Sequence, residues 1–387
     1  MESRKTWLLN YGMGVDSTAI LVRWILEPES RPFDSLDDLV VLTAQTGDEF
    51  WSTKMMVEQF VLPLLREHEI RFVQVAKAGP SKCDGYTVLS DTREPWTCHT
   101  EGDYRLSQNL IAAGTVPRLG RPHICAIRWK GDVLDPWIGD HISGAIGPAI
   151  GYNADEPKRV AKSNEYGCRS ADYFYPLVEW GWGRDRCIDY LRETFGVIWP
   201  KSCCYFCPFQ KDFDASDRWK KEPIYGAEAL WVAGFGLAFN PRMHLMSKGS
   251  AMEIAQAHGC FEAIALYEEW LEAHDWSVYQ VRRIYTNTGT SAKTRINARR
   301  DVKTLDTGDR TEMTHKLHSL AFRVGAEVEL CGEWYRAYTE CRGDGYPAIE
   351  EFLVACPAAP SDKCQHLRNF NNTWAKLTAT VQMSLAL

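Results

Sequence analysis

Short apolar runs alternate with amphipathic stretches in the first part of the chain. Residues 7–9 and 39–44 are almost continuously apolar, as in the buried strands of a parallel sheet, and residues 71–75 predict the next strand. Residues 51–69 follow a helical pattern that Pro63 should kink. Strands that alternate with helices form βαβ units. We therefore predict an α/β fold with a doubly wound, mostly parallel sheet, which binds ligands at the carboxyl ends of its strands.

The pattern changes after about residue 212. Before this point, residues 145–150 predict a further strand, and residues 184–195 predict a helix that ends at Gly196. Beyond it, residues 214–275 have a helical pattern, and short β-like runs follow at 277–281 and 326–330. One apolar face of the helical part is formed by Ile254, Ala257, Phe261, Ile264 and Leu271.

The length of the chain predicts more than one domain. Its 387 residues exceed the size at which a single core usually stops growing. We predict a first domain at 1–212, a helical extension at 213–275 and a small C-terminal α+β module at 276–387. The sequence leaves the role of the last module open.

A glycine turn joins the first predicted strand to the first predicted helix. It is formed by residues 10–18, Asn-Tyr-Gly-Met-Gly-Val-Asp-Ser-Thr. Gly12 and Gly14 let a ligand approach the backbone, and the N–H groups at the start of the helix are open to an anion such as phosphate. Ser17 and Thr18 add hydroxyl donors, and Asp16 either caps the helix or holds a metal ion beside the phosphates. A purely structural glycine turn would have the same pattern.

The turn resembles the pyrophosphate-binding loop of the N-type ATP pyrophosphatases, or PP-loop proteins. The similar form Y-G-G-G-V-D-S-T is common among relatives of phosphoadenosine phosphosulfate (PAPS) reductase, and Met13 replaces one of its glycines. Later segments carry the same resemblance in the same order over about the first 210 residues. They are Thr46, Gly47, Asp48, Glu49 and Thr53, with Gln45 in place of an aspartate; Cys125 and Lys130; Gly151, Ala154, Asp155, Glu156 and Arg159; and residues 175–180 followed by 204–209.

This resemblance implies an adenine nucleotide alpha hydrolase-like fold that binds ATP, or a PAPS-like adenine nucleotide, together with Mg²⁺. The residues that it assigns to nucleotide binding are Tyr11, Gly12, Gly14, Val15, Asp16, Ser17, Thr18, Thr46, Gly47, Glu49, Gly151, Asp155 and Glu156. The residues that it assigns to catalysis are Asp16, Ser17, Lys130 and Arg159. Lys130 and Arg159 would offset the charge of the phosphates. Without the surrounding motifs, both would be ordinary surface charges.

The cysteines indicate metal, cluster or sulfur chemistry. The chain has 13 of them and is too long to need disulfides for stability. Cys204 and Cys207 form a C-x-x-C motif with Cys203 beside it, and two thiols do not fill a tetrahedral metal site. Further ligands must therefore come from elsewhere in the chain.

The resemblance to cluster-bearing adenylylsulfate reductases implies Cys125 as a third ligand, although Ile124 stands where those enzymes have a second cysteine. Cys98, Cys168 and Cys203 compete for the fourth place. We predict an iron–sulfur cluster of the [4Fe–4S] type, with zinc as the alternative metal and a metal-free redox dithiol as a third possibility. The metal ligands in this prediction are Cys125, Cys203, Cys204 and Cys207.

The preferred function is cleavage of ATP to AMP and pyrophosphate to adenylate an acceptor, followed by cluster-assisted sulfur transfer to a nucleic acid or a small molecule. The pattern is closest to enzymes of tRNA thiolation and DNA phosphorothioation. Reduction of PAPS or adenylylsulfate is an alternative, but residues 382–387 lack the cysteine tail of PAPS reductases. A second alternative is a non-catalytic nucleotide-binding module of a larger, defence-type assembly, which the departures at Met13 and Gln45 motivate.

The net charge and the distribution of basic residues help to predict whether the protein binds nucleic acid. The net charge of −7 argues against general attraction to nucleic acid. Residues 282–303 nevertheless contain seven basic residues against the single acid Asp301 and could follow a phosphate backbone, although a solvated hairpin or a surface for an acidic partner explains them nearly as well. The seven are Arg282, Arg283, Lys293, Arg295, Arg299, Arg300 and Lys303.

The apolar runs of the sequence are too short to cross a membrane, and the start of the chain has no long apolar signal segment. We therefore predict a cytoplasmic enzyme. Its expected partners are an adenine nucleotide, a nucleic acid and a sulfur-donor protein. The sequence gives no indication of the oligomeric state.

Overall fold

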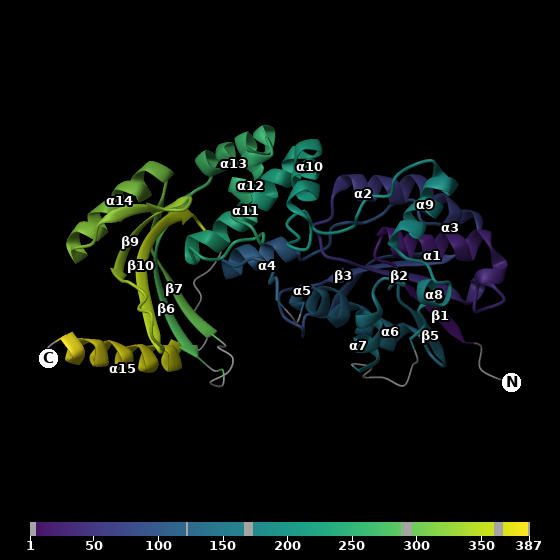
Figure 1. Cartoon of the computed structure of the whole chain (residues 1–387), viewed down its shortest axis with the longest axis horizontal. Helices are drawn as coiled ribbons and strands as arrows, with labels where there is room; N and C mark the ends of the chain where they lie inside the picture. Colours follow the sequence, from purple (N-terminus) through teal and green to yellow (C-terminus); the bar gives the residue numbers. More distant parts are fainter. Residues whose placement is uncertain are drawn as a thin grey trace. The chain divides into compact units, whose positions relative to one another are not determined.

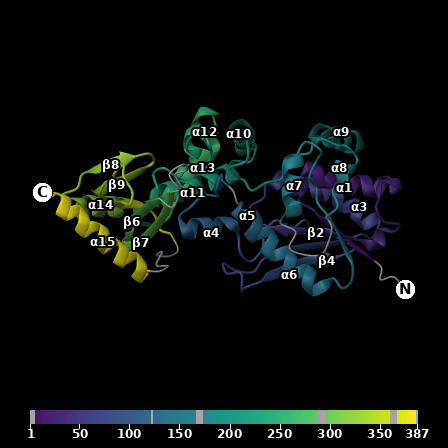
Figure 2. The same ribbon diagram turned by 60° about the horizontal axis from the view of Figure 1, so that its bottom comes forward.

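The computed structural model describes residues 5–120, 123–165, 173–287, 289, 296–359 and 367–385. The chain forms two compact units, and Figures 1 and 2 show their elements from two directions. Unit 1 comprises Met1–Gln108 and Arg118–Cys207, and unit 2 comprises Asn109–Pro117 and Pro208–Leu387. The predicted helical extension and C-terminal module thus lie within one unit, which begins close to the predicted border at residue 212.

Unit 1 is built on a sheet with the strand order β4-β3-β2-β1-β5. Neighbouring strands are parallel, except that β4 is antiparallel to β3. The prediction of an α/β fold with a mostly parallel sheet is therefore confirmed. The strands are β1 (Thr6–Asn10), β2 (Leu39–Gln45), β3 (Arg71–Lys77), β4 (Tyr86–Thr92) and β5 (Ile146–Ala149). The helices are α1 (Val15–Leu26), α2 (Trp51–Met56), α3 (Leu62–Glu67), α4 (Leu106–Ala113), α5 (Ile124–Ala126), α6 (Asp132–His141), α7 (Pro157–Glu165), α8 (Pro176–Glu179) and α9 (Arg184–Phe195). The border between the units lies within α4. Short 3₁₀ turns lie at Pro28–Ser30 and Leu36–Asp38, and π turns lie at Val57–Val61 and Ile127–Gly131.

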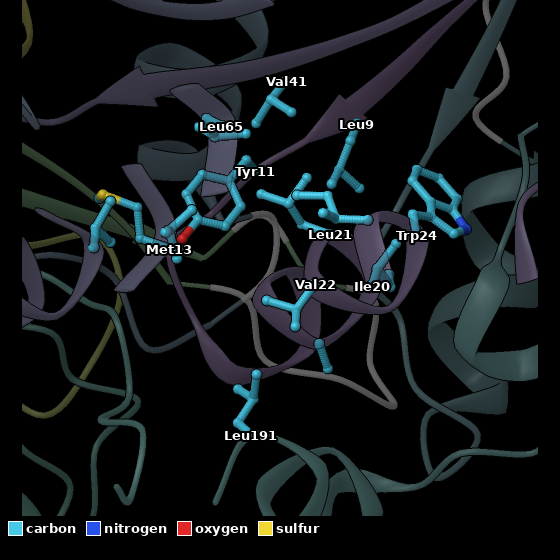
Figure 3. Packing of buried hydrophobic residues seen from close by; sticks show 14 of the residues in the cluster. Leu9, Tyr11, Met13, Ile20, Leu21, Val22, Trp24, Val41, Leu65 and Leu191 are labelled. Carbon is cyan, nitrogen blue, oxygen red and sulfur yellow. The ribbon is translucent and has the colours of Figure 1, made fainter. Parts of the chain in front are cut away.

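Helices cover both faces of this sheet (Figure 2). On one face, Leu9 of β1 and Val41 of β2 pack in a cluster with residues of α1, α3 and α9, which Figure 3 shows from close by. On the other face, Leu8 of β1 and Val40 of β2 pack with Trp137 of α6. Successive side chains of a strand point to opposite faces, so a sheet that is covered twice requires apolar residues at every position. This explains the continuous apolar runs of the sequence.

The predicted helix at residues 51–69 is interrupted. α2 ends at Met56, Val57–Val61 form a π-helical turn, and α3 begins at Leu62. Pro63 has no N–H group to donate, and its ring excludes the regular hydrogen bond to the preceding turn. The regular α-helical pattern is therefore lost just before the proline, and the predicted kink stays a prediction.

Unit 2 combines a helical part with an antiparallel sheet of strand order β7-β6-β10-β9-β8. The helical pattern at 214–275 and the predicted α+β character of the last segment agree with this. The helices are α10 (Asp212–Lys221), α11 (Pro223–Phe239), α12 (Ala251–Ala257), α13 (Phe261–Ala273), α14 (Arg310–Val324) and α15 (Leu367–Leu385). The strands are β6 (Trp276–Asn287), β7 (Ile296–Gly308), β8 (Val328–Cys331), β9 (Trp334–Glu340) and β10 (Ala348–Pro357).

The prediction that five residues between 254 and 271 form one apolar helix face is wrong. Gly259 lies between α12 and α13 at φ +72°, a left-handed conformation that ends a helix. Ile254 and Leu271, on either side of this break, are buried, but Phe261 is 74% exposed. In the described ranges of the chain, no helix is long and apolar enough to span a membrane.

Candidate functional site

The glycine turn between β1 and α1 has the predicted strand–turn–helix geometry. α1 begins at Val15, and Gly14 precedes it in an extended conformation. The first N–H groups of a helix have no acceptor within the helix and carry the positive end of its dipole. The Ser17 hydroxyl stabilises the turn, because it accepts a hydrogen bond from the Gly12 N–H group (3.2 Å) and donates one to the Gly14 carbonyl oxygen (3.3 Å).

Not every predicted nucleotide-binding residue of this turn is open to a ligand. Tyr11, Val15 and Thr18 are buried, and the hydroxyl groups of Tyr11 and Thr18 lie 3.2 Å apart. Burial raises the pKa of Tyr11 far above its usual value. These three side chains therefore support the turn from the core side, where Figure 3 shows Tyr11 packed among apolar residues.

Met13 and Gln45, the two residues that depart from the PP-loop pattern, contact each other. Met13 has φ +59°, a conformation that favours glycine, which the related loops have at one of the turn positions. The Gln45 side-chain amide donates to the Met13 sulfur (3.6 Å), and Gln45 is buried at the end of β2. A buried aspartate at this position would need a charged partner, whereas a neutral amide does not. Trp199 holds the turn as well, because its indole N–H group donates to the Met13 carbonyl oxygen (2.9 Å).

Gly151 lies directly against the start of α1. It follows β5, the sheet neighbour of β1. A Cβ atom at this position would be 3.2 Å from the Ser17 backbone nitrogen, which is tighter than nearly all real contacts. By contrast, a Cβ atom on Gly12 would meet only the Ser17 hydroxyl at 4.0 Å. The glycines therefore keep the backbone around the helix start free of side chains.

Asp16 combines burial with an incomplete set of partners. Its Oδ2 atom accepts a hydrogen bond from the Arg184 guanidinium (2.7 Å) and one from the Asn153 amide (3.4 Å). Its Oδ1 atom is buried and has no hydrogen-bond partner among the described residues. Burial raises the pKa of the Asp16 carboxyl, and the Arg184 charge lowers it in part. A buried carboxylate oxygen without a partner can receive a cation.

Arg184 is the functional candidate that the sequence reasoning missed. It is the first residue of α9, and the Asp155 carboxylate accepts a hydrogen bond from its backbone N–H group (2.8 Å). A cation at the N-terminus of a helix opposes the helix dipole, so it needs a carboxylate partner. The local sequence does not identify this partner as Asp16, because the two residues lie 168 positions apart in the chain.

The turn after β2 binds the cysteine segment. The Thr46 hydroxyl lies 3.2 Å from the Cys204 sulfur. The Glu49 carboxylate accepts hydrogen bonds from the Cys203 N–H group (3.1 Å) and the Ser202 hydroxyl (2.6 Å). A Cβ atom on Gly14 would lie 3.8 Å from the Cβ atom of Ser202. The structure thus brings the glycine turn, the Thr46–Glu49 turn and the cysteine segment together within unit 1.

Gly47 and Asp48 have structural roles in this arrangement. Gly47 has φ +88°, and a Cβ atom there would clash with Arg105 at 2.6 Å. The Asp48 carboxylate is buried and accepts hydrogen bonds from the Ser107 N–H group (2.9 Å), the Arg105 guanidinium (3.2 Å) and the Tyr205 hydroxyl (2.8 Å). Burial raises the pKa of Asp48. Its partners leave it little capacity to bind a ligand.

Three of the four predicted metal ligands lie close enough to influence one another. Burial raises the pKa of the Cys125 and Cys204 thiols, and the nearby Cys207 raises both further. Across the described residues, however, no group of three or more His, Cys, Asp or Glu side chains converges on one point that could hold a metal ion. The described thiols therefore do not form a ready metal site, and the predicted cluster and its zinc alternative stay predictions.

The competing cysteine ligands differ in position. Cys98 is fully buried in the core of unit 1, and its thiol lies 3.6 Å from the Met13 sulfur. Burial raises the pKa of Cys98 to about 12, as expected for an inert core thiol. The Cys203 sulfur is 3.9 Å from the Lys201 carbonyl oxygen. Cys168 lies outside the described residues.

The predicted catalytic cations do not lie in contact with the glycine turn. Arg159 forms an ion pair with Glu156, and its guanidinium lies 4.5 Å from the centre of the Tyr152 ring. Lys130 is exposed in the π turn before α6, near enough to Cys125 to lower the pKa of that thiol. Arg184, by contrast, contacts the turn through Asp16.

Three of the seven basic residues at 282–303 are engaged inside unit 2. Arg282 pairs with Asp301 (2.7 Å), and the buried Arg283 lies 3.5 Å from the Glu350 carboxylate. Arg300 donates to the carbonyl oxygens of Gly114 (2.9 Å) and Ala113. Burial lowers the pKa of Arg300 to about 10. Lys293 and Arg295 lie outside the described residues.

Comparisons of the chain with protein-family models, with curated proteins and with solved structures found no match. The fold and the site therefore define the protein only as a class: an α/β unit with a glycine turn and an open helix start at the carboxyl edge of its sheet, joined to an α+β unit.

Proposed function

We propose that unit 1 binds the phosphates of an adenine nucleotide at the β1–α1 turn and cleaves ATP to AMP and pyrophosphate. The observation that supports this best is the start of α1, where Gly12, Gly14 and Gly151 leave the backbone free of side chains. An anion there meets N–H groups and the positive end of the helix dipole. The turn also lies at the carboxyl edge of a parallel sheet, where such folds bind ligands. The choice of an adenine nucleotide rests on the resemblance to PP-loop proteins.

Asp16 fits a magnesium ion in this proposal. Its buried Oδ1 atom has no hydrogen-bond partner among the described residues. Mg²⁺ is commonly held by one or two carboxylates and the phosphates of its substrate, and it supplies charge neutralisation to the transferring phosphoryl group. The Arg184 guanidinium occupies the other carboxylate oxygen and orients the side chain.

In the proposed reaction, an acceptor oxygen bonds to the α-phosphorus of ATP. The bond from the α-phosphorus to the bridging oxygen breaks, pyrophosphate leaves with the electron pair, and the proton of the acceptor passes to solvent. Negative charge grows on the phosphate oxygens, and the N–H groups of the turn stabilise it. Lys130 and Arg159 keep their implied roles as part of this proposal, and we add Arg184 to them.

The position of the cysteine segment supports an extension to sulfur transfer. The Cys204 thiol is hydrogen-bonded to the Thr46 hydroxyl, and Ser202 lies beside Gly14, so the cysteine segment lies next to the turn. With sulfide as the donor, its sulfur bonds to the activated atom of the acceptor, and AMP leaves with the electron pair of the broken bond to oxygen. The acceptor is a nucleic acid or a small molecule. No step of this proposal depends on an iron–sulfur cluster.

Pyrophosphate release tests the proposal. The full chain is incubated with Mg²⁺–ATP and with tRNA, DNA or no acceptor, each with and without sulfide, and pyrophosphate and AMP are quantified. We expect equal amounts of both products. We also expect a loss of at least about tenfold in Ser17→Ala, which removes the hydroxyl that stabilises the turn. Ser90→Ala in β4 is the matched control. Bound ATP without pyrophosphate under every condition would contradict cleavage.

A non-catalytic nucleotide-binding module is the second candidate, and one contact favours it. Arg184 already engages the Asp16 carboxylate at 2.7 Å, so the carboxylate is partly neutralised before any ligand arrives. In that case Arg184→Gln binds ATP and still releases no pyrophosphate. If unit 1 cleaves ATP, the same variant changes the rate of pyrophosphate release, because the orientation of Asp16 changes.

A further inference from the structure

Unit 2 contains a cavity of about 620 Å³, within the range of small-molecule binding sites. It is lined by residues of α12, α13, β6, α14, β9 and β10, and by Glu333, which precedes β9. All of these residues belong to unit 2. The cavity is therefore separate from the proposed nucleotide site in unit 1.

Aromatic rings form part of the wall. Trp276 and Trp334 lie edge to face with ring centres 5.7 Å apart, and both line the cavity. Tyr267 lines it from α13, and Tyr335 lines it with 49% of its surface exposed. The face of an aromatic ring carries negative charge and attracts cations.

The charged lining residues are mostly acidic. Glu268, Glu269, Glu272 and Glu333 line the cavity, and Arg310 is the basic residue among its described lining. Carboxylates next to aromatic faces are the combination that holds an ammonium or guanidinium group.

Arg310 shows that these walls already hold a guanidinium group. Its side chain forms an ion pair with Glu272. The same guanidinium lies 5.0 Å from the centre of the Trp276 ring. One carboxylate and one aromatic face of the cavity are thus engaged by an internal cation, while Trp334 and Glu333 line the cavity at β9 and just before it.

We propose that this cavity binds an organic cation that carries a guanidinium or primary ammonium group, through the aromatic faces and carboxylates that line it. The cation is either a free small molecule or the side chain of an arginine or lysine on a partner protein. Both present the same chemistry to the cavity.

Glu333 gives the proposed binding a pH dependence. Burial and the nearby Glu253 raise the pKa of Glu333 to about 7, against the lowering effects of Ser250 and Arg336. Tyr267, the titratable neighbour from α13, is itself buried, with a pKa well above its usual value. A bound cation favours the ionised carboxylate. Binding is therefore stronger above pH 7 and weaker below it.

Isothermal titration calorimetry on the full chain tests the proposal. The free probe is n-butylguanidinium, and n-butylurea is its neutral control of almost the same shape. A pentapeptide with one central arginine represents a partner side chain, and the same peptide with citrulline is its neutral control. We expect the cation of at least one pair to bind at least about tenfold more tightly than its neutral control.

Substitutions place the binding in the cavity. Glu333→Gln removes the charge of a half-buried carboxylate without a large change of shape, and we expect about tenfold weaker binding. Glu327→Gln, in the exposed loop before β8, is the matched control and leaves binding unchanged. Arg310→Gln releases Glu272 and the Trp276 face and strengthens binding.

Each outcome decides the proposal. Tight binding of free n-butylguanidinium identifies a small-molecule site, and binding of the arginine peptide alone identifies a site for a partner side chain. Binding in either arm should weaken from pH 8 to pH 6. Equal binding of cations and neutral controls, no binding in either arm, or unchanged binding in Glu333→Gln would overturn it.

Discussion

Two segments were predicted to bind phosphate groups: the β1–α1 turn of unit 1 and the β6–β7 hairpin of unit 2. They differ in how many of their polar and charged side chains have partners inside the protein. At the turn, glycines leave the backbone open, and the Asp16 Oδ1 atom has no hydrogen-bond partner among the described residues. In the hairpin, Arg282 and Arg283 pair with carboxylates of unit 2, and Arg300 bonds to backbone carbonyls. The turn thus leaves one carboxylate oxygen without a hydrogen-bond partner among the described residues, whereas three basic residues of the hairpin are engaged by groups of unit 2.

The difference shows what kind of sequence signal indicates a site. The glycine turn is a backbone geometry, which local sequence determines through the conformations that glycine allows. A count of basic residues says nothing about where their partners lie. Arg300 caps the carbonyls at Ala113 and Gly114, which are more than 180 positions away in the chain. A contact of this kind depends on tertiary packing, so the charge pattern alone does not tell which basic residues have partners inside the protein, and the nucleic-acid surface stays a prediction.

Asp16→Asn should have the largest effect of the changes that sharpen this comparison. We expect a loss of about a hundredfold or more in pyrophosphate release, because the charge proposed to hold Mg²⁺ is removed. The rate with saturating ATP and Mg²⁺ measures it. Asp34→Asn, an exposed carboxylate in the loop after α1, is the control and should keep the wild-type rate.

Asp16→Asn should lose activity, but its free energy of unfolding should increase relative to that of wild type as the pH rises. Burial raises the pKa of Asp16, so its contribution to stability is complete at pH values below the unfolded pKa and is lost as the pH rises through the folded pKa. The asparagine does not titrate, so Asp16→Asn should gain stability relative to wild type as the pH rises from 4 to 7. Urea unfolding at several pH values checks this. A variant that loses stability relative to wild type as the pH rises from 4 to 7 would show that the ion pair with Arg184 dominates instead.

Arg300→Met should cause the next largest effect, which is on folding. The substitution leaves the carbonyl oxygens of Ala113 and Gly114 without their guanidinium donor, and we expect a loss of about 2 kcal/mol in the free energy of unfolding. Arg299→Met is the matched control, because Arg299 is exposed and its contact with Thr373 is long at 3.4 Å. We expect a change within about 0.5 kcal/mol for it. A change within about 0.5 kcal/mol in Arg300→Met would mean that the hairpin does not use Arg300 for folding.

Gly151→Ala should weaken nucleotide binding by about tenfold. The new Cβ atom would lie 3.2 Å from the Ser17 backbone nitrogen, so the start of α1 must shift or the phosphate site narrows. Calorimetric titration with ATP measures the dissociation constant. Gly139→Ala in α6 adds the same atom where nothing lies within 4 Å and should bind ATP normally. Normal binding by Gly151→Ala would place the phosphates elsewhere.

Arg159→Gln should have the smallest effect on stability. Arg159 pairs with Glu156 on the surface, with 54% of its side chain exposed, and such pairs contribute little. We expect a change within about 0.5 kcal/mol in the free energy of unfolding. Pyrophosphate release by the same variant then tests its implied catalytic role without interference from unfolding. An unchanged rate would remove Arg159 from the site.

Local pattern was enough for most of the elements that position the site. β1, the turn and α1 were predicted, and so was α9 with Gly196 in the left-handed conformation at its end. β4 was missed because it is a polar, half-exposed edge strand without an apolar run. The contact between Met13 and Gln45 and the ion pair between Asp16 and Arg184 could not be predicted, because each joins residues that only the folded sheet brings together.

Hydrogen–deuterium exchange with and without Mg²⁺–ATP tests the central claim most directly. A ligand that binds the N–H groups at the start of α1 slows their exchange, because these groups have no acceptor within the helix. We predict protection in peptides that cover residues 11–18, and unchanged exchange in peptides from β6 and β7. Protection of the hairpin peptides with no change at residues 11–18 would contradict nucleotide binding at the start of α1. It would indicate instead that unit 2 binds the phosphates.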